Sequence, residues 1–339
     1  MNGKGQFAGP APAISVLLPT YNGARYVTEQ LNSILKQTWT DFELLAIDDG
    51  SKDATTAILA DYAASDDRIR ILPSTGNRGQ KARLVELLDQ SRGQWIAIAD
   101  QDDIWALDKT ERLVRAAGSA ALAFGRSELI DADGKRLGRT LLDMLGAQRR
   151  DGERLSLLLR PQVSGHAMIV RREFVTPDAF ESPLPFDWLI SLVAEFSRGI
   201  VYDDEAVVFH RMHGSNSHNT NVLVRANPSL LRSHHVRELI TLVKRRRLGL
   251  IEACGRLADS DFVPDEKRRR FREVEQLCAS AWTTPRQRRY AGDLRSSILA
   301  ILKPMAGSDQ DWNTVFDRLT VLTHGLFHPQ TLIRLGRVL

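Results

Sequence analysis

The feature of this sequence that most constrains its fold is a regular alternation of strand-like and helix-like patterns between residues 14 and 117. Short apolar runs such as FELLAID at 42–48 and WIAIA at 95–99 lack an inward–outward alternation, which is typical of strands buried on both faces. Each run is followed by apolar residues at helical spacing. We expect strands at 14–19, 42–48, 68–72 and 95–99, and helices at 27–35, 53–64, 81–88 and 109–117. This rhythm predicts an α/β fold with a Rossmann-like, mostly parallel sheet flanked by helices.

The pattern changes after residue 120. We expect a strand at 121–130, a turn at 131–134, charged helical structure at 138–160, a strand at 164–170, a helix at 187–196 and one or two strands at 200–210. From 216 onward the sequence has mainly amphipathic helix patterns. We therefore predict three parts: a flexible lead-in at 1–13, an α/β domain at 14–215 and a C-terminal helical extension at 216–339.

Composition places the chain among ordinary globular proteins. It is 43% hydrophobic and 26% charged, which argues against extensive disorder. No apolar run reaches about 18 residues, and the first residues lack the apolar core of a signal peptide. Two cysteines provide neither a disulfide framework nor a zinc site. These features predict a cytoplasmic location.

Acidic residues gather where two of the predicted strands end. Asp48 and Asp49 follow the second strand, and Asp100, Asp102 and Asp103 follow the fourth. The carboxyl ends of parallel strands meet at one edge of the sheet, where ligands bind. Because clustered carboxylates repel one another, a hard divalent cation, Mg²⁺ or Mn²⁺, would offset the cost. The alternative for DDGS at 48–51 is an ordinary turn that caps the next helix.

Other phosphate-binding devices are missing from the sequence. It has no GxxxxGK[ST] loop, no GxGxxG after the first strand and no GxSxG elbow. A P-loop NTPase, a dinucleotide enzyme and an α/β-hydrolase are therefore unsupported. A nucleotide diphosphate bound through a metal ion is the interpretation that remains.

Three motifs in order resemble a known enzyme family. SVLLPTYNG, IDDGSKDAT and ADQDDIW stand at the predicted strand ends in the order and spacing of the inverting family 2 glycosyltransferases, which have the GT-A fold. The DQDDIW form is similar to the rhamnosyltransferase-type branch that builds bacterial surface polysaccharides. The resemblance covers about residues 13–215. It implies transfer of a sugar from a nucleotide-diphosphate donor, a dTDP- or UDP-sugar and in that branch dTDP-rhamnose, to a hydroxyl of a surface polysaccharide or lipid-linked glycan.

The same resemblance implies a set of donor-binding residues. Thr20, Tyr21 and Asn22 would border the nucleotide. Asp49, the second acid of DDGS, would hydrogen-bond the base. Lys81 stands where that branch often has a basic residue near the diphosphate.

Three further residues match the family's metal positions. Asp102 would ligate the Mg²⁺ or Mn²⁺ that bridges the diphosphate, with Asp100 in support as the first acid of DxD. FHRMHGSN at 209–216 resembles a late YRQHGxN motif, which makes His213 the candidate third contact. His166 and His210 have no such support, and we expect them to be structural. Asp103 is expected to position Asp102 or to cap the following helix.

The resemblance also supplies a candidate catalytic base. PFDWLISLVA at 185–194 is similar to the family's HDWW-like helix start, with Phe186 in the place of His, and Asp187 would be the base. Inverting transfer needs one such group to take the proton of the acceptor hydroxyl. The alternative from position alone is that Asp187 caps its helix.

The C-terminal part is basic. Residues 216–339 contain 21 Lys and Arg against 12 Asp and Glu, including KRRR runs at 244–247 and 267–270. Together with apolar helix faces, this charge suggests peripheral attachment to the anionic inner face of the cytoplasmic membrane. The alternative is an extension that packs on the catalytic domain or in a dimer. No recognisable nucleic-acid fold accompanies the charge, so no nucleic-acid partner is expected.

Two other functions compete with glycosyl transfer. A nucleotidyltransferase would share the nucleotide-binding sheet and the acidic metal site, although it calls for a Gly-rich basic loop where this chain has TYNGARY. A non-catalytic sugar-nucleotide-binding scaffold, tethered by the basic tail, would be expected to lack intact carboxylates. Asp49, Asp102 and Asp187 are all present.

Overall fold

The computed structural model describes residues 11–144, 155–158, 161–182, 184–214 and 248–280. The chain forms two compact units. The first contains residues up to 141 together with 164–182 and 200–212, and the second contains 142–163, 183–199 and 213 onward. Each unit is thus assembled from separate stretches of the sequence.

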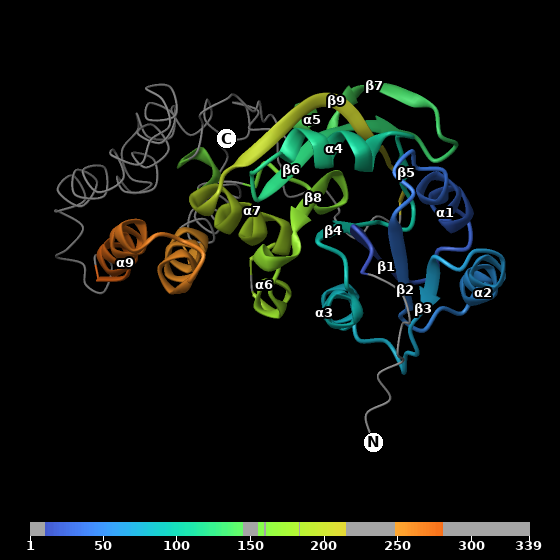
Figure 1. Ribbon diagram of the computed structural model, residues 1–339, viewed down its shortest axis with the longest axis horizontal. Helices are drawn as coiled ribbons and strands as arrows, with labels where there is room; N and C mark the ends of the chain where they lie inside the picture. Colours follow the sequence, from blue (N-terminus) through green and yellow to red (C-terminus); the bar gives the residue numbers. More distant parts are fainter. Residues whose placement is uncertain (1–10, 145–154, 159–160, 183, 215–247, 281–339) are drawn as a thin grey trace, which may run out of the picture. The chain divides into compact units, whose positions relative to one another are not determined.

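The first unit is built on a mixed sheet (Figure 1). Within the described residues the strand order is β3-β2-β1-β4-β8-β6-β9-β5, and β7 pairs with β6. Strands β1, β2, β3 and β4 pair in parallel, as predicted, whereas β8 runs antiparallel to β4 and β6. The strands are β1 Ile14–Thr20, β2 Phe42–Asp48, β3 Ile69–Ile71, β4 Trp95–Ile98, β5 Ile104–Trp105, β6 Leu122–Ile130, β7 Arg136–Thr140, β8 Met168–Arg171 and β9 Ile200–Arg211.

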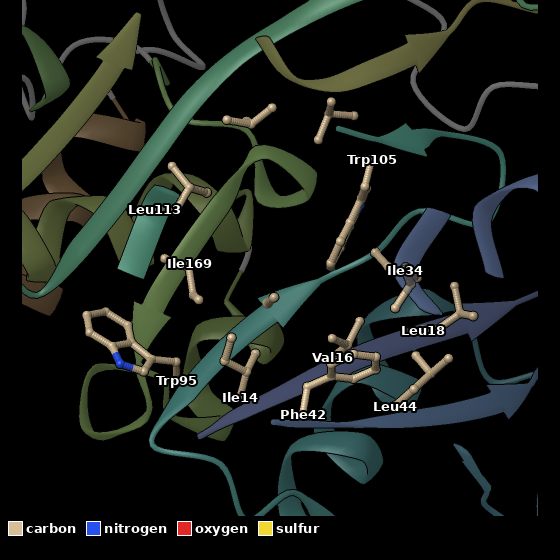
Figure 2. Close-up of a cluster of buried hydrophobic side chains, with 14 of the residues drawn as sticks. Ile14, Val16, Leu18, Ile34, Phe42, Leu44, Trp95, Trp105, Leu113 and Ile169 are labelled. Carbon is tan, nitrogen blue, oxygen red and sulfur yellow. The ribbon is translucent and has the colours of Figure 1, made fainter. Parts of the chain in front are cut away.

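Helices cover both faces of this sheet. They are α1 Val27–Leu35, α2 Thr55–Ser65, α3 Gln80–Gln90 and α4 Lys109–Ala117. The cluster in Figure 2 joins alternate residues of β1 (Ile14, Val16 and Leu18) with side chains of α1, α2 and α4. Because successive strand residues point to opposite faces, Leu17 lies on the other face, where α3 packs against β1 and β2. The predicted elements up to residue 117 agree with these bounds within two residues, so the predicted α/β architecture is confirmed.

Beyond residue 130 the agreement is partial. The predicted helical stretch at 138–160 is wrong at its start, where β7 continues to Thr140 as an exposed strand before the short helix α5 Leu141–Met144. The predicted strand at 164–170 begins as a 3₁₀ turn, η2 Gly165–Ala167, and only then continues as β8. The remaining short elements are η1 Leu155–Leu158, η3 Arg172–Phe174 and α6 Pro177–Glu181.

The described part of the second unit is helical. Helix α7 spans Phe186–Ser197, residues 248–259 form another helix, and α9 spans Asp265–Ser280. Phe196 of α7 packs edge-to-face on Phe271 of α9, with 4.9 Å between ring centroids. Gly249 lies against the ring of Trp188, where a Cβ would stand 3.5 Å from the indole. No helix among the described residues is long and apolar enough to cross a membrane.

Three of the four residues in the basic run at 267–270 have partners within this unit. Lys267 Nζ donates to the carbonyl of Phe196 at 3.0 Å, Arg268 lies 2.9 Å from Asp261, and Arg270 lies 2.9 Å from Glu266. These contacts use part of the charge of the run within the unit itself. The other predicted run, 244–247, and most of the predicted helical extension lie outside the described residues.

Candidate active site

The sheet has a switch point between β1 and β4. From β1 the chain passes outward through β2 to β3, and β4 then returns to the other side of β1. In open α/β sheets, ligands bind outside the carboxyl ends of the strands at such a point. Residues 20–23 follow β1 and residues 100–103 follow β4, so two of the predicted motifs meet there. We call residues 48–53, after the adjacent β2, the first acidic loop and residues 100–103 the second acidic loop.

The residues after β1 are tied to the first acidic loop. Thr20 Oγ1 donates to Asp48 Oδ1 at 3.0 Å, and the Asn22 amide donates to Ser51 Oγ at 2.8 Å. In return the Lys52 amide donates to Asn22 Oδ1 at 2.9 Å. Asn22 has a left-handed φ of 48°, a conformation that asparagine tolerates well. Tyr21, 46% exposed, therefore stands on a fixed backbone beside the switch point.

Asp49 is buried, and both of its carboxylate oxygens accept hydrogen bonds from the chain. Its Oδ1 accepts from the Arg78 amide and from Arg83 Nε, both at 2.7 Å, and its Oδ2 accepts from the Gly79 amide at 2.8 Å. Burial acts to raise the pKa of the Asp49 carboxyl, but these amides and the Arg83 guanidinium outweigh it and hold the pKa below its usual value. Asp49 thereby fixes the turn that precedes α3.

Lys81 lies on the exposed side of α3. Its Nζ donates to the carbonyl of Ser182 at 2.7 Å. In this structure the ammonium thus links α3 to the segment that follows α6. A contact with a diphosphate stays a prediction.

The second acidic loop presents two partly exposed carboxylates. Asp100 Oδ2 lies 3.3 Å from His166 Nδ1, and Asp100 Oδ1 accepts from Gln80 Nε2 at 3.3 Å. The Asp102 carbonyl accepts from the buried Arg211 Nε at 2.9 Å, which holds the loop backbone against β9.

A third carboxylate, Asp103, lies completely buried behind this rim. Its Oδ1 is 2.9 Å from His210 Nδ1 and accepts from the Arg211 amide at 3.0 Å. Its Oδ2 lies 3.9 Å from His166 Nδ1 and accepts no hydrogen bond from the described residues. The His166 and His210 rings stack nearly parallel, with centroids 4.7 Å apart. Sequence reasoning assigned both histidines a structural role and did not predict this cluster.

The acids of the cluster affect the pKa values of the basic groups beside them. Burial acts to lower the pKa of His210, but the charge and hydrogen bond of Asp103, with the charges of Asp100 and Asp102, raise it to about 9. The buried Lys109 Nζ donates to the His166 carbonyl at 2.5 Å and lies 3.4 Å from the Trp105 ring centroid. Burial lowers the pKa of Lys109 well below its usual value, against the opposing effect of Asp103 and Asp100. Lys109 is a second member that sequence reasoning missed.

This donor set fits a divalent cation. Asp103, His166 and His210 offer ligand atoms that all lie within 4.8 Å of one another. Asp100 and Asp102 add carboxylates at the rim of the same loop. Carboxylate oxygens suit Mg²⁺ and Mn²⁺, whereas imidazole nitrogens favour Mn²⁺ or softer ions. The buried Asp103 Oδ2 accepts no hydrogen bond from the described residues, so this oxygen can serve as a metal ligand.

Asp187 and His213 belong to the second unit. Asp187 lies in the first turn of α7, partly exposed, and its Oδ1 accepts from the Trp188 amide at 2.8 Å. His213 follows β9 and is partly exposed. Their roles as base and metal ligand stay predictions.

Comparisons with known proteins agree with this geometry. Residues 15–176 match the family model described as "Glycosyl transferase family 2". TuaG of Bacillus subtilis, named for teichuronic acid biosynthesis, is 32% identical over 38% of this chain and 52% of its own length. The Escherichia coli enzyme WfgD, named as a UDP-Glc:alpha-D-GlcNAc-diphosphoundecaprenol beta-1,3-glucosyltransferase, is 31% identical over 35% of this chain and 47% of its own length. The chain thus spans about half the length of these relatives.

Solved structures share the fold. S. aureus TarS 1–349 in complex with UDP-GlcNAc superposes with a TM-score of 0.55 at 16% identity, over 96% of this chain and 90% of that chain. The mannosyltransferase PcManGT of Pyrobaculum calidifontis, in complex with GDP-Man and Mn²⁺, gives a TM-score of 0.50 at 16% identity, over 97% and 87%. The motifs at the switch point, the mixed sheet and the solved structures lead to one conclusion: residues 15–176 of this chain match glycosyl transferase family 2, and the chain has a GT-A fold.

Proposed function

We propose that the protein is a nucleotide-sugar-dependent, inverting glycosyltransferase that extends a bacterial surface polysaccharide. The observation that carries the proposal is the second acidic loop at the switch point of a family 2 domain, where Asp100 and Asp102 are partly exposed in front of the buried Asp103. Acids at this position suit a diphosphate held through a metal ion.

For the donor we propose a pyrimidine nucleotide, a UDP- or dTDP-sugar. Asp49 Oδ2 accepts one hydrogen bond from the Gly79 amide, and a carboxylate oxygen has room for a second from the imide N–H of a pyrimidine base. The relatives and structures named for UDP-Glc and UDP-GlcNAc support this class. Transfer from dTDP-rhamnose is a narrower form of the proposal, which rests on the ADQDDIW motif.

The leaving diphosphate needs charge stabilisation. Asp102 and Asp100 would hold Mg²⁺ or Mn²⁺, with His213 as the third group, and the bound cation would stabilise the diphosphate as it departs. Thr20, Tyr21 and Asn22 would border the nucleotide on the fixed backbone after β1. Lys81 would leave the Ser182 carbonyl to pair with the diphosphate.

Asp187 is proposed as the general base. The acceptor hydroxyl oxygen forms its bond to the anomeric carbon as the bond from that carbon to the diphosphate oxygen breaks, and the hydroxyl proton passes to the Asp187 carboxylate. The Trp188 amide orients that carboxylate. One displacement of this kind inverts the configuration of the sugar.

The acceptor is proposed to be a lipid-linked glycan, as the name of WfgD suggests for that enzyme. A lipid-linked acceptor would be met at the inner face of the cytoplasmic membrane, and the net positive charge of residues 216–339 would favour that surface. Because Lys267, Arg268 and Arg270 have partners within the unit, the attraction would come mainly from other cations of this region.

The experiment that tests the proposal is a thermal-shift panel of nucleotide diphosphates and their sugars, with Mg²⁺, with Mn²⁺ and with chelator. A ligand at 100 times its Kd stabilises by about 2.7 kcal/mol. We expect a metal-dependent response to a uridine or thymidine diphosphate that Asp102→Asn abolishes. Asp108→Asn, which removes the same charge six residues away on an exposed side chain, is the matched control.

Two further outcomes separate the competing functions. Asp187→Asn is expected to keep nucleotide binding while lowering transfer by orders of magnitude. Unchanged transfer in that variant would exclude Asp187 as the base, and binding without any transfer in the wild type would favour the scaffold. A response to nucleoside triphosphates alone would favour a nucleotidyltransferase, and a folded protein that responds to no nucleotide would contradict the proposal.

A further inference from the structure

Gln101, the middle residue of the DQD motif, joins the second acidic loop to the residues after β1. Its side-chain Oε1 accepts from the Tyr21 amide at 2.9 Å, and its Nε2 donates to the Tyr21 carbonyl at 3.0 Å. One side chain thus pairs with both backbone groups of one residue, as a neighbouring strand would. The pairing continues the contact of β1 and β4 beyond Leu17 and Ile98, where their ladder ends.

Gly23 provides the space for this pairing. A Cβ on Gly23 would stand 2.6 Å from Cδ of Gln101, closer than packed atoms can approach. The φ of Gly23 is not in the left-handed region, so an alanine there would meet a steric conflict with Gln101 and no backbone strain. The Gly23 amide also donates to Thr55 Oγ1 at 2.8 Å, which fixes the glycine against α2.

The second acidic loop is itself held from behind. Arg211 Nε donates to the Asp102 carbonyl at 2.9 Å, and its amide donates to Asp103 at 3.0 Å. The same guanidinium pairs with Glu29 of α1 at 2.6 Å. A movement of the loop that carries Asp100 and Asp102 is therefore transmitted to the Tyr21 backbone most directly through Gln101, which lies between the two acids.

We propose that Gln101 is a positioning residue that couples the metal-binding carboxylates to the nucleotide-binding backbone. A divalent cation held by Asp100 and Asp102 restrains the loop, Gln101 then holds the Tyr21 backbone, and the nucleotide binds to a surface that is already ordered. The coupling is reciprocal, so a bound nucleotide also tightens the metal site. This inference rests on the proposed function, because it assigns the two ligands to these two segments.

The first test uses the metal alone and does not depend on the nucleotide. Hydrogen exchange of the Tyr21 amide is followed by NMR with Mg²⁺ and with chelator. In the wild type, Mg²⁺ is expected to slow that exchange about fivefold, the effect of one stabilised hydrogen bond. In Gln101→Ala the amide exchanges faster and Mg²⁺ no longer changes its rate. Gln90→Ala, at the exposed end of α3, is the matched control. A Tyr21 amide that is indifferent to Mg²⁺ in the wild type would overturn the inference.

The second test is a double-mutant cycle between Gln101 and Gly23. Gly23→Ala is expected to displace the Gln101 side chain and so weaken metal-dependent nucleotide binding about tenfold, as Gln101→Ala does. In the Gln101→Ala background the clash is gone, and Gly23→Ala should have no further effect. Losses that add in the double variant would show that the two residues act separately and would contradict the inference.

The two tests keep this inference apart from the proposed function. If the wild type binds no nucleotide diphosphate, the proposed function fails, while the response of the Tyr21 amide to Mg²⁺ still decides whether Gln101 transmits metal binding. If the wild type binds nucleotide and metal but all four proteins of the cycle bind equally well, the inference fails and the proposed function stands.

Discussion

The two acidic loops stand at the ends of β2 and β4, the strands on either side of β1, but the structure treats their carboxylates differently. In the first loop, Asp48 accepts from Thr20, Gly50 and Ser51, and Asp49 accepts from two amides and Arg83. In the second loop, one buried oxygen of Asp103 accepts no hydrogen bond from the described residues, and Asp100 lies 3.3 Å from both His166 Nδ1 and Gln80 Nε2.

This difference separates carboxylates that hold the backbone in place, which we call the scaffold, from carboxylates that can bind a metal ion, which we call the site. A carboxylate whose oxygens are filled by its own chain fixes a backbone and has little capacity left for a cation. A carboxylate group backed by His166, His210 and Lys109 is kept in place but not saturated, so it can accept a metal ion without rearranging. Similar acidic pairs in a sequence can therefore serve different purposes, and the surrounding donors decide which.

The largest effect that would test this contrast is on stability. Arg83→Met leaves Asp49 buried without its cation, and breaking a buried pair from one side costs about 3–5 kcal/mol. Asp102→Asn in the second loop changes a partly exposed group and should cost less than about 1 kcal/mol. Chemical denaturation in the presence of chelator measures both. Similar losses from the two substitutions would contradict the division into scaffold and site.

A smaller effect concerns pH, where the loops should respond in opposite directions. The pKa of Asp49 is lowered on folding, so its contribution is present above the unfolded value of about 3.9 and is lost as the pH falls through the folded pKa. The pKa of His210 is raised from 6.5 to about 9, so its contribution is present below pH 6.5 and is lost as the pH rises toward 9. We expect this alkaline loss to be roughly 1–3 kcal/mol.

The measurement is the free energy of unfolding against pH, in chelator, for the wild type and two variants. Arg83→Met should reduce the pH dependence of the free energy of unfolding on the acid side alone, because it removes the main cation that stabilises ionised Asp49. His210→Gln should flatten the alkaline limb alone. A variant that flattens both limbs would show that the loops titrate as one unit.

The fold could be predicted from the sequence where it depends on local pattern. The elements up to residue 117 have buried apolar runs and helical spacing. The strand β7 was missed because its residues 136–140 are mostly exposed and form no apolar run. The second acidic loop was predicted because strand ends meet at one edge of a parallel sheet. The helix predicted at 187–196 was confirmed as α7.

The histidine cluster could not be predicted in the same way. His166 and His210 are 44 positions apart, and they meet because η2 leads into β8 while β9 pairs with both β5 and β6. No spacing rule connects residues brought together by such pairing. The buried Lys109 reads as the first residue of an amphipathic helix, and only its position beside Trp105 and the His166 carbonyl reveals its role.

The smallest expected effect sharpens the contrast within the first loop. Ser51 Oγ accepts from the Asn22 amide at 2.8 Å and donates to Asp48 Oδ1 at 2.5 Å. Ser51→Ala removes both bonds from a partly buried site and should cost about 1 kcal/mol of stability. If the first loop is scaffold, the stabilisation that Mg²⁺ gives should be the same in Ser51→Ala as in the wild type, measured by thermal unfolding with and without chelator. A loss of that metal response would show that the first loop contributes to metal binding, directly or through the Tyr21 backbone that Gln101 holds.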